Sequence, residues 1–274
     1  TRLVNEMRRN HSLGILETLI LGHAYIGALL MTSHMKGRDR LSVSLSCDGP
    51  VGGISVESNV LGEVRGYLQN AHIQLTTPPT SFDTAPYIGT GILTVTRFPE
   101  GARRPFSGSI EFVGGDFATN LARYYVTSEQ TPSAFSLSVQ FDERGLVVGA
   151  GGLMLQALPE ARNDALAILE DRLLTMESVG LTLSRGDTAA HMIHRDFAEF
   201  SPEIIGTKEV RFLCHCSKAR FGNFVARLPA EEINEIIEAG DFPMKTTCHN
   251  CNTTYEFSRS EVDRLLERAK MHEA

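Results

Sequence analysis

Two short stretches near the end of the chain decide its organisation. Residues 212–216 read Phe-Leu-Cys-His-Cys, and residues 248–251 read Cys-His-Asn-Cys. The chain has five cysteines, and these stretches hold four of them, as a C-x-C pair and a C-x-x-C pair separated by 31 residues. Two thiol pairs on separate turns can each occupy one edge of a tetrahedron, as a four-thiolate zinc site requires. The spacing therefore predicts one zinc ion per chain, held by Cys214, Cys216, Cys248 and Cys251.

The region around these pairs, residues 206–274, is short for a unit that folds on its own core. A unit below about 70 residues rarely buries enough apolar surface to fold unaided, and zinc binding can add about 10–16 kcal/mol of apparent stability. The spacing leaves open whether the site is a passive staple or redox-active, and the C-x-C pair favours the second. His215 and His249 are expected to be bystanders, because four thiolates complete the tetrahedron. Two helices are expected here, from Ala230 to Ala239 and from about Ser260 through Leu266.

Residues 1–180 predict one α+β core domain of mixed sheet and helix. The apolar face of residues 12–35 predicts a helix, and Leu41, Val43 and Leu45 alternate with serines as in a half-buried strand. A turn at Asp48-Gly49-Pro50 then predicts a hairpin. Further strands are expected at 90–97, 135–141 and 146–150, and helices at 117–128 and 165–179, the last one ended by Gly180. Since the strands cluster instead of alternating with helices, the pattern favours α+β over a βαβ fold.

Residues 181–205 predict an amphipathic helical connector between this domain and the cysteine region. Its apolar side consists of Met192, Ile193, Phe197 and Phe200. His191 and His194 form an H-x-x-H pair that we expect at the surface.

Composition and charge exclude several classes of function. The net charge of −7 disfavours nucleic acid or an anionic membrane as the partner, and residues 203–274 carry 10 Lys and Arg against 12 Asp and Glu. The longest apolar stretch, Leu19–Met31, is too short to span a bilayer and contains His23, so we expect a mostly buried helix. A zinc enzyme is disfavoured because catalytic zinc keeps an open coordination position. No ATP-binding G-x-x-x-x-G-K-[ST] motif is present.

Cellular location is suggested by two absences. The sequence shows no signal peptide, and an odd number of cysteines suits a reducing cytosol better than a secreted disulfide framework. We therefore expect a cytoplasmic protein. The chain opens Thr-Arg-Leu-Val without an initiator methionine, and we expect an upstream segment that this sequence does not include.

Several core stretches, taken with the cysteine spacing, resemble one known family. They are Asp48-Gly49-Pro50, Gly62-Glu63-Val64-Arg65-Gly66-Tyr67, Ser128-Glu129-Gln130-Thr131-Pro132 and Ala150-Gly151-Gly152. In this order, over essentially the whole chain, they resemble the redox-regulated chaperones of the heat shock protein 33 family. Cys47 departs from the family pattern as an extra thiol, and we expect it to be a small half-buried residue.

The resemblance implies a stress-response chaperone that is not an enzyme, that holds unfolding client proteins, and that is silent while reduced and zinc-bound. It implies that oxidation forms the Cys214–Cys216 and Cys248–Cys251 disulfides, releases zinc and unfolds the cysteine region and the connector. Met192, Ile193, Phe197 and Phe200 become candidate client-binding residues on this basis. The resemblance also implies a homodimer when active, and no ATP, nucleic acid or membrane as partner.

Overall fold

The computed structural model describes residues 1–75, 81–158, 161 and 163–273. The chain forms two compact units, Thr1–Leu213 and Cys214–Ala274. The division into core domain, connector and cysteine region made from the sequence remains a prediction.

The N-terminal unit is built on a six-stranded sheet in the order β5-β4-β1-β2-β3-β8. Its strands are β1 Arg40–Cys47, β2 Gly53–Asn59, β3 Glu63–Leu68, β4 Gly91–Phe98, β5 Phe106–Phe112 and β8 Arg211–Phe212. The first five pair antiparallel, whereas β8 pairs in parallel with β3. Leu41, Val43 and Leu45 are all buried, so the predicted alternation and the hairpin between β1 and β2 are confirmed.

The turn at Asp48 is fixed by its own carboxylate. Its two oxygens accept hydrogen bonds from the backbone N–H of Thr90 at 2.6 Å and from the Thr90 hydroxyl at 2.9 Å. These bonds lower the pKa of Asp48. Asp48 thus ties the hairpin turn to the start of β4.

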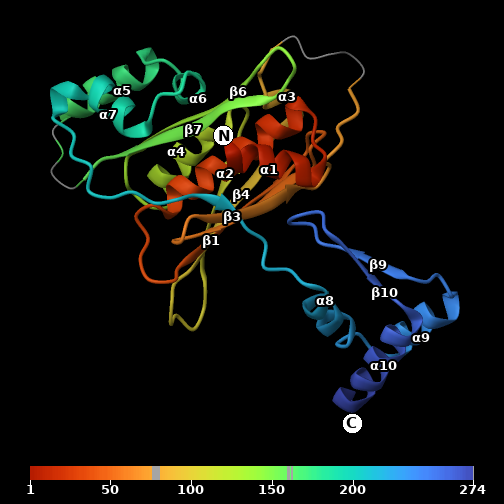
Figure 1. Ribbon diagram of the computed structural model, residues 1–274. Coiled ribbons are helices and arrows are strands. Elements are labelled where there is room, and N and C mark those ends of the chain that lie inside the picture. The colour runs from red at the N-terminus through yellow and green to blue at the C-terminus, as the bar shows by residue number, and fades with distance from the viewer. Residues whose placement is uncertain (76–80, 159–160, 162, 274) are drawn as a thin grey trace. The chain divides into compact units, whose positions relative to one another are not determined.

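Helices α1 (Arg2–His11), α2 (Ile15–Thr32) and α4 (Phe117–Thr127) lie between this sheet and a second sheet (Figure 1). The second sheet pairs β6 (Ser133–Phe141) with β7 (Val147–Gln156). A short helix α3, Ala85–Ile88, precedes β4. The predicted helices at 12–35 and 117–128 and the α+β class are confirmed, whereas α1 and β5 were not anticipated.

Helix α2 is the centre of the N-terminal core. By length and composition alone it could cross a membrane, but 78% of it is buried inside the unit. The hydroxyl of Tyr25 donates to the Gly66 carbonyl at 2.9 Å, and that of Ser58 donates to the Ala28 carbonyl at 2.9 Å. These contacts, together with its burial, mark α2 as a core helix packed on the sheet, as the sequence predicted.

The predicted helix at 165–179 is wrong at its end. Helix α5 spans Asn163–Thr175, and a separate helix α6, Val179–Ser184, begins after Ser178, whose hydroxyl accepts from the Leu181 N–H. Gly180 lies inside α6, where a Cβ on it would lie 2.5 Å from the Ser138 hydroxyl oxygen of β6. The glycine therefore serves a helix-to-strand contact and not a helix end.

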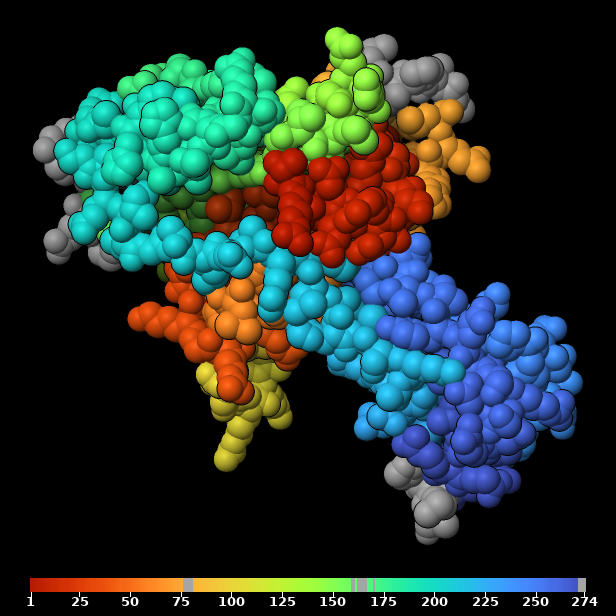
Figure 2. All heavy atoms as spheres, in the orientation of Figure 1, coloured from red at the N-terminus to blue at the C-terminus, as the bar shows by residue number. Residues whose placement is uncertain are grey.

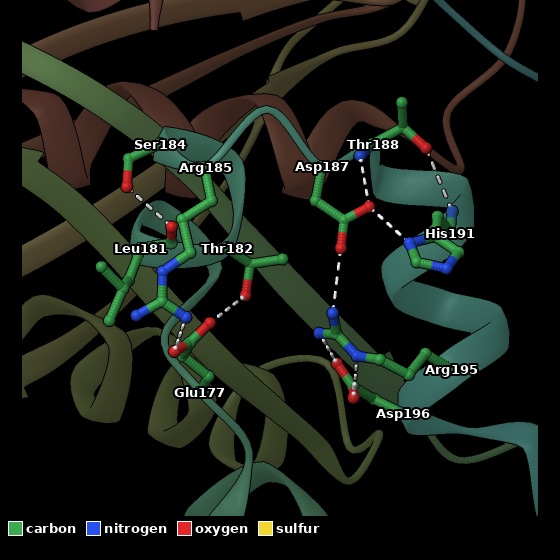
Figure 3. A network of polar contacts seen from close by, with 10 residues as sticks. All are labelled: Glu177, Leu181, Thr182, Ser184, Arg185, Asp187, Thr188, His191, Arg195 and Asp196. Carbon is green, nitrogen blue, oxygen red and sulfur yellow. Dashed lines mark hydrogen bonds and ion pairs between the residues drawn. The ribbon is translucent and has the colours of Figure 1, made fainter.

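Beyond α6, the connector forms helix α7 (Ala189–Asp196) and a 3₁₀ turn, Ala198–Phe200. Asp187 lies just before α7, and its carboxylate accepts from His191 at 2.6 Å and from Arg195 at 2.9 Å (Figure 3). Arg195 also forms two hydrogen bonds with Asp196 at 2.8 Å. His191 and His194 are exposed, as predicted. The network joins the first and last turns of α7, although exposed ion pairs of this kind each stabilise by less than about 1 kcal/mol.

The described residues of the C-terminal unit, 214–273, form three helices and one hairpin. These are α8 Lys218–Val225, α9 Ala230–Ala239, β9 Met244–Thr247, β10 Thr254–Phe257 and α10 Arg259–Glu273. Helix α9 has the predicted bounds, and Gly240 ends it in the left-handed conformation. Its small core contains eight buried residues: Val225, Ala226, Ile233, Phe257, Val262, Leu265, Leu266 and Ala269.

Candidate metal centre

Two turns of the C-terminal unit carry the four cysteines. Cys214 and Cys216 precede α8, whose N-terminus is capped by the Ser217 hydroxyl. Cys248 and Cys251 lie in the turn between β9 and β10, where the N–H groups of Cys251 and Asn252 donate to the Cys248 carbonyl. Asn252 adopts a left-handed conformation, which closes this turn. Each pair is thus held by local backbone structure.

The four sulfur atoms all lie within 4.8 Å of one another. The Sγ atoms of Cys214 and Cys248 are 3.7 Å apart, and those of Cys216 and Cys251 are 3.2 Å apart. A tetrahedral zinc ion with bonds of about 2.3 Å to sulfur places its ligands about 3.8 Å apart. The donor set and its spacing fit such an ion, so the four cysteines could hold a metal.

The electrostatics of the cluster favour a bound cation over four free thiols. Burial raises the pKa of Cys248 and of Cys216, and the neighbouring thiols raise both further. Burial also acts to raise the pKa of Cys251, but hydrogen bonds with Thr253 and the other cysteines outweigh it and lower this pKa to about 7. Of these three thiols, Cys251 alone has a lowered pKa. Cys216 and Cys248 tend to stay protonated, and a divalent cation would stabilise them as charged thiolates.

Two residues that contact the sulfur atoms were not predicted from the sequence. The Tyr255 hydroxyl donates to the Cys216 sulfur at 3.1 Å, and Thr253 contacts the Cys251 sulfur at 3.3 Å. Partners of this kind orient metal ligands and tune their charge. Their closeness in sequence to Cys251 was a usable signal, but which strand residue faces the sulfurs depends on the hairpin register.

His215 and His249 contribute no nitrogen to the cluster found among the described residues. Cys47 does not belong to the cluster; it ends β1 in the N-terminal unit and is a half-buried free thiol whose pKa is raised by burial. The sulfur cluster therefore consists of the four residues that the spacing singled out.

The connector residues predicted to bind clients differ in exposure. Met192 and Phe197 are 2% and 5% exposed, whereas Ile193 and Phe200 are half-buried. All four belong to the N-terminal unit. Their role in client binding remains a prediction.

A mixed α+β unit followed by a small unit with four clustered cysteines defines the class: a two-unit protein with a thiolate site that could bind metal or form disulfides. The family model described as "Hsp33 protein" matches residues 1–258. The chain belongs to this family of chaperones, as the resemblance predicted.

Known relatives agree along nearly the whole chain. The "33 kDa chaperonin" of Desulforamulus reducens is 37% identical over 98% of this chain and 91% of its own length, and that of Enterococcus faecalis is 34% identical over 98% and 90%. The crystal structure of the 33 kDa chaperonin (heat shock protein 33 homolog) of Thermotoga maritima superposes with a TM-score of 0.84. It is 30% identical and covers 97% of this chain and 90% of that one. The relatives' name describes a chaperone role, not an enzymatic one.

Proposed function

We propose that this protein is a redox-regulated holdase, inactive when reduced and metal-bound and activated when oxidation opens its C-terminal unit. The observation that carries the proposal is the four-sulfur cluster, which joins two turns that are 31 residues apart in sequence. The unit's core has eight buried residues, which is little for independent folding. A link between the two turns would therefore decide whether the unit is folded.

Zinc is the metal we propose, one ion per chain, with Cys214, Cys216, Cys248 and Cys251 as its ligands. Four thiolates without a carboxylate match the preference of structural zinc sites. When bound, zinc supplies a crosslink and holds the thiolates deprotonated. The chain's own residues supply the rest: Tyr255 donates to one sulfur, and Lys218 pairs with Glu261 at 2.6 Å to tie α8 to α10.

Oxidation would then pair neighbouring cysteines, Cys214 with Cys216 and Cys248 with Cys251. Each disulfide closes a very short loop and constrains the unfolded chain by about 2 kcal/mol, against about 4 kcal/mol for a bond across the whole segment. Neither neighbouring bond joins the two turns. Losing the metal in this way removes the crosslink, whereas bonds between Cys214 and Cys248 and between Cys216 and Cys251 would preserve it.

The opened protein would bind unfolding clients through apolar surface. Met192 and Phe197, now buried, are the side chains whose exposure would change most if the connector left the core. We propose that the active form is a homodimer in the cytoplasm, and that holding a client requires neither ATP nor nucleic acid.

The decisive experiment measures three quantities on reduced and peroxide-treated protein: bound zinc, disulfide pairing by peptide mapping, and suppression of client aggregation by light scattering. We expect one zinc per chain and no suppression before oxidation, and loss of zinc, the two neighbouring disulfides and suppression after it. Cys47→Ser serves as the matched control and should behave like the unmodified chain. Equal suppression in both states would refute the proposal.

A further inference from the structure

Two loops of the N-terminal unit meet at one end of the six-stranded sheet. Residues 36–39 lead into β1, and residues 99–105 join β4 to β5. In the pairing of β1 with β4, Arg40 lies opposite Phe98, so the start of β1 is beside the end of β4. In Figure 2 the yellow tip of the β4–β5 hairpin projects from the unit, and the orange-red loop before β1 lies next to it. The two loops therefore form one surface.

The two carboxylates at this surface hold the loops together. Glu100 accepts a hydrogen bond from the Arg38 backbone N–H at 3.1 Å, and the Glu100 N–H donates to the Asp39 carboxylate at 2.7 Å. The Glu100 carboxylate also lies 3.8 Å from the Arg38 guanidinium. Gly37 has a φ of +62°, and a Cβ on it would lie 2.7 Å from a Glu100 carboxylate oxygen. Both carboxylates are thus bonded to loop backbone, and they fix the geometry of the two loops.

Positive charge gathers around a pocket of about 230 Å³ between these loops. Its charged lining consists of four arginines, Arg38, Arg40, Arg103 and Arg104, and one carboxylate, Glu100. In the part of the chain that the structure describes, Arg40, Arg103 and Arg104 form no ion pair. The whole chain carries a net charge of −7, so its average composition does not account for this local excess of guanidinium groups.

Guanidinium groups in this arrangement suit a compact ligand with adjacent negative charges. Each can bind phosphate through two parallel hydrogen bonds. The Arg40 guanidinium is already oriented, because it stacks on the Phe98 ring at 4.9 Å from the centroid and keeps its N–H edge for a ligand.

The size of the pocket and the density of charge favour linked phosphoryl groups. Its volume is that of about eight water molecules at about 30 Å³ each, which is more than one phosphoryl group fills. Linked phosphoryl groups carry their charges on adjacent atoms. Neighbouring glutamates of a peptide carry theirs on flexible side chains, which lose rotamer freedom when they are held together in a small pocket.

We propose that this arginine pocket binds an oligophosphate, a ligand with two or more linked phosphoryl groups. Arg40 from one loop and Arg103 and Arg104 from the other bind the phosphoryl oxygens, while Glu100 keeps the loops together. Inorganic tripolyphosphate and the triphosphate of a nucleotide both present this chemistry. Binding forms and breaks no covalent bond. The site lies wholly in the N-terminal unit and does not depend on the redox role proposed for the cysteines.

Titration of the reduced, zinc-loaded full chain with tripolyphosphate tests the proposal. Calorimetry measures the affinity, and backbone amide NMR locates the ligand. We expect shifts of the amide resonances of Arg38, Gly101 and Ala102, and an affinity that falls as salt is added, because salt screens exposed charges. Zinc content is measured after each titration, because oligophosphates chelate zinc, and it should not change.

Three variants test the role of the arginines. Arg103→Gln should weaken tripolyphosphate binding about tenfold or more, because it removes a charged hydrogen-bonding group. Arg40→Lys should weaken it too, since lysine keeps the charge but lacks the planar fork that stacks on Phe98. Arg144→Gln is the matched control: it removes one exposed positive charge from the turn between β6 and β7, outside the pocket, and should leave the affinity within about twofold. All three should keep the circular dichroism spectrum of the unmodified chain.

Comparison of ATP, tripolyphosphate and adenosine distinguishes the two sources of the ligand. Adenosine has no phosphate and should not bind. Tighter binding of ATP than of tripolyphosphate identifies a nucleotide as the ligand, and the reverse order identifies an inorganic oligophosphate.

Three results would overturn the proposal. They are an absence of amide shifts in the two loops with tripolyphosphate, an equal loss of affinity in Arg103→Gln and Arg144→Gln, and binding of a hexaglutamate peptide as tight as that of tripolyphosphate. The last result would assign the pocket to an acidic protein segment. None of these measurements reports on client aggregation, so the proposed function stands or falls separately.

Discussion

Ile233→Ala in the C-terminal unit tests whether metal binding and folding of that unit are one event. Ile233 lies on α9, is 0% exposed and belongs to the unit's small core. Truncating a fully buried isoleucine to alanine costs about 3 kcal/mol, and truncating it to valine costs about 1 kcal/mol. If the unit folds only with metal, this cost appears in the metal affinity, because the apparent dissociation constant is the intrinsic one divided by the folded fraction.

The magnitudes follow from about 1.4 kcal/mol per tenfold change in an equilibrium constant. Ile233→Ala should raise the apparent zinc dissociation constant about 150-fold, and Ile233→Val about fivefold. The assay is competition with a chromophoric chelator at fixed pH on reduced protein, with circular dichroism to follow folding. Ile237→Ala, at a half-buried position on the same helix, should have an intermediate effect.

An unchanged zinc affinity in Ile233→Ala, together with a lower melting temperature, would refute the reasoning. The unit would then be folded before it binds metal, and loss of metal would not open it.

Three further predictions concern the N-terminal unit. Phe197→Ser removes a ring that is 5% exposed and should weaken the packing of the connector by about 3 kcal/mol, so that half-maximal suppression of client aggregation needs less peroxide. If the variant needs the same peroxide concentration as the unmodified chain, the connector does not have this role. Burial lowers the pKa of His23 to about 4, so below pH 6.5 the unfolded chain binds a proton that the folded chain does not, and stability should fall by about 2 kcal/mol from pH 7.5 to 5. His23→Gln should abolish that difference in urea unfolding, and an identical pH dependence in both proteins would contradict it. Gly149→Ala would place a Cβ 1.9 Å from the Gly180 carbonyl oxygen and should destabilise the unit by about 1–3 kcal/mol, as measured by calorimetry. Gly206→Ala is the control, because a Cβ there would have no atom within 4 Å, and it should not lower stability. Equal melting temperatures for the two variants would argue against tight packing of α6.

The elements predicted well from the sequence are those with a strong local signal. Alternation at Leu41, Val43 and Leu45 gave β1 because one face of the strand is buried and the other is not. Helix α9 has a clear apolar stripe and a terminal glycine, so both ends were predicted. The cysteine cluster was predicted from spacing alone, since two short pairs suit one tetrahedral site.

The features that escaped prediction depend on distant contacts. β8 is two residues long and exists because β3, far away in sequence, offers an edge. β5 carries small polar residues, Ser107, Gly108 and Ser109, which give no apolar alternation. Helix α6 begins after Ser178, whose hydroxyl caps it, and it packs so closely on β7 that a Cβ on Gly149 would lie 1.9 Å from the Gly180 carbonyl oxygen, a contact that the local sequence does not reveal. Tyr255 needed the hairpin register before its contact with Cys216 could be seen.

All four sulfurs belong to residues 214–274, about a fifth of the chain, and none comes from the sheet-bearing unit. If metal release unfolds this unit, the larger N-terminal unit keeps its core. Recovery on reduction then requires only a short, mostly helical segment to refold. Helical segments with local contacts fold fast. Such an architecture suits a sensor that is reset many times in the life of one molecule, without passing through the fully unfolded chain.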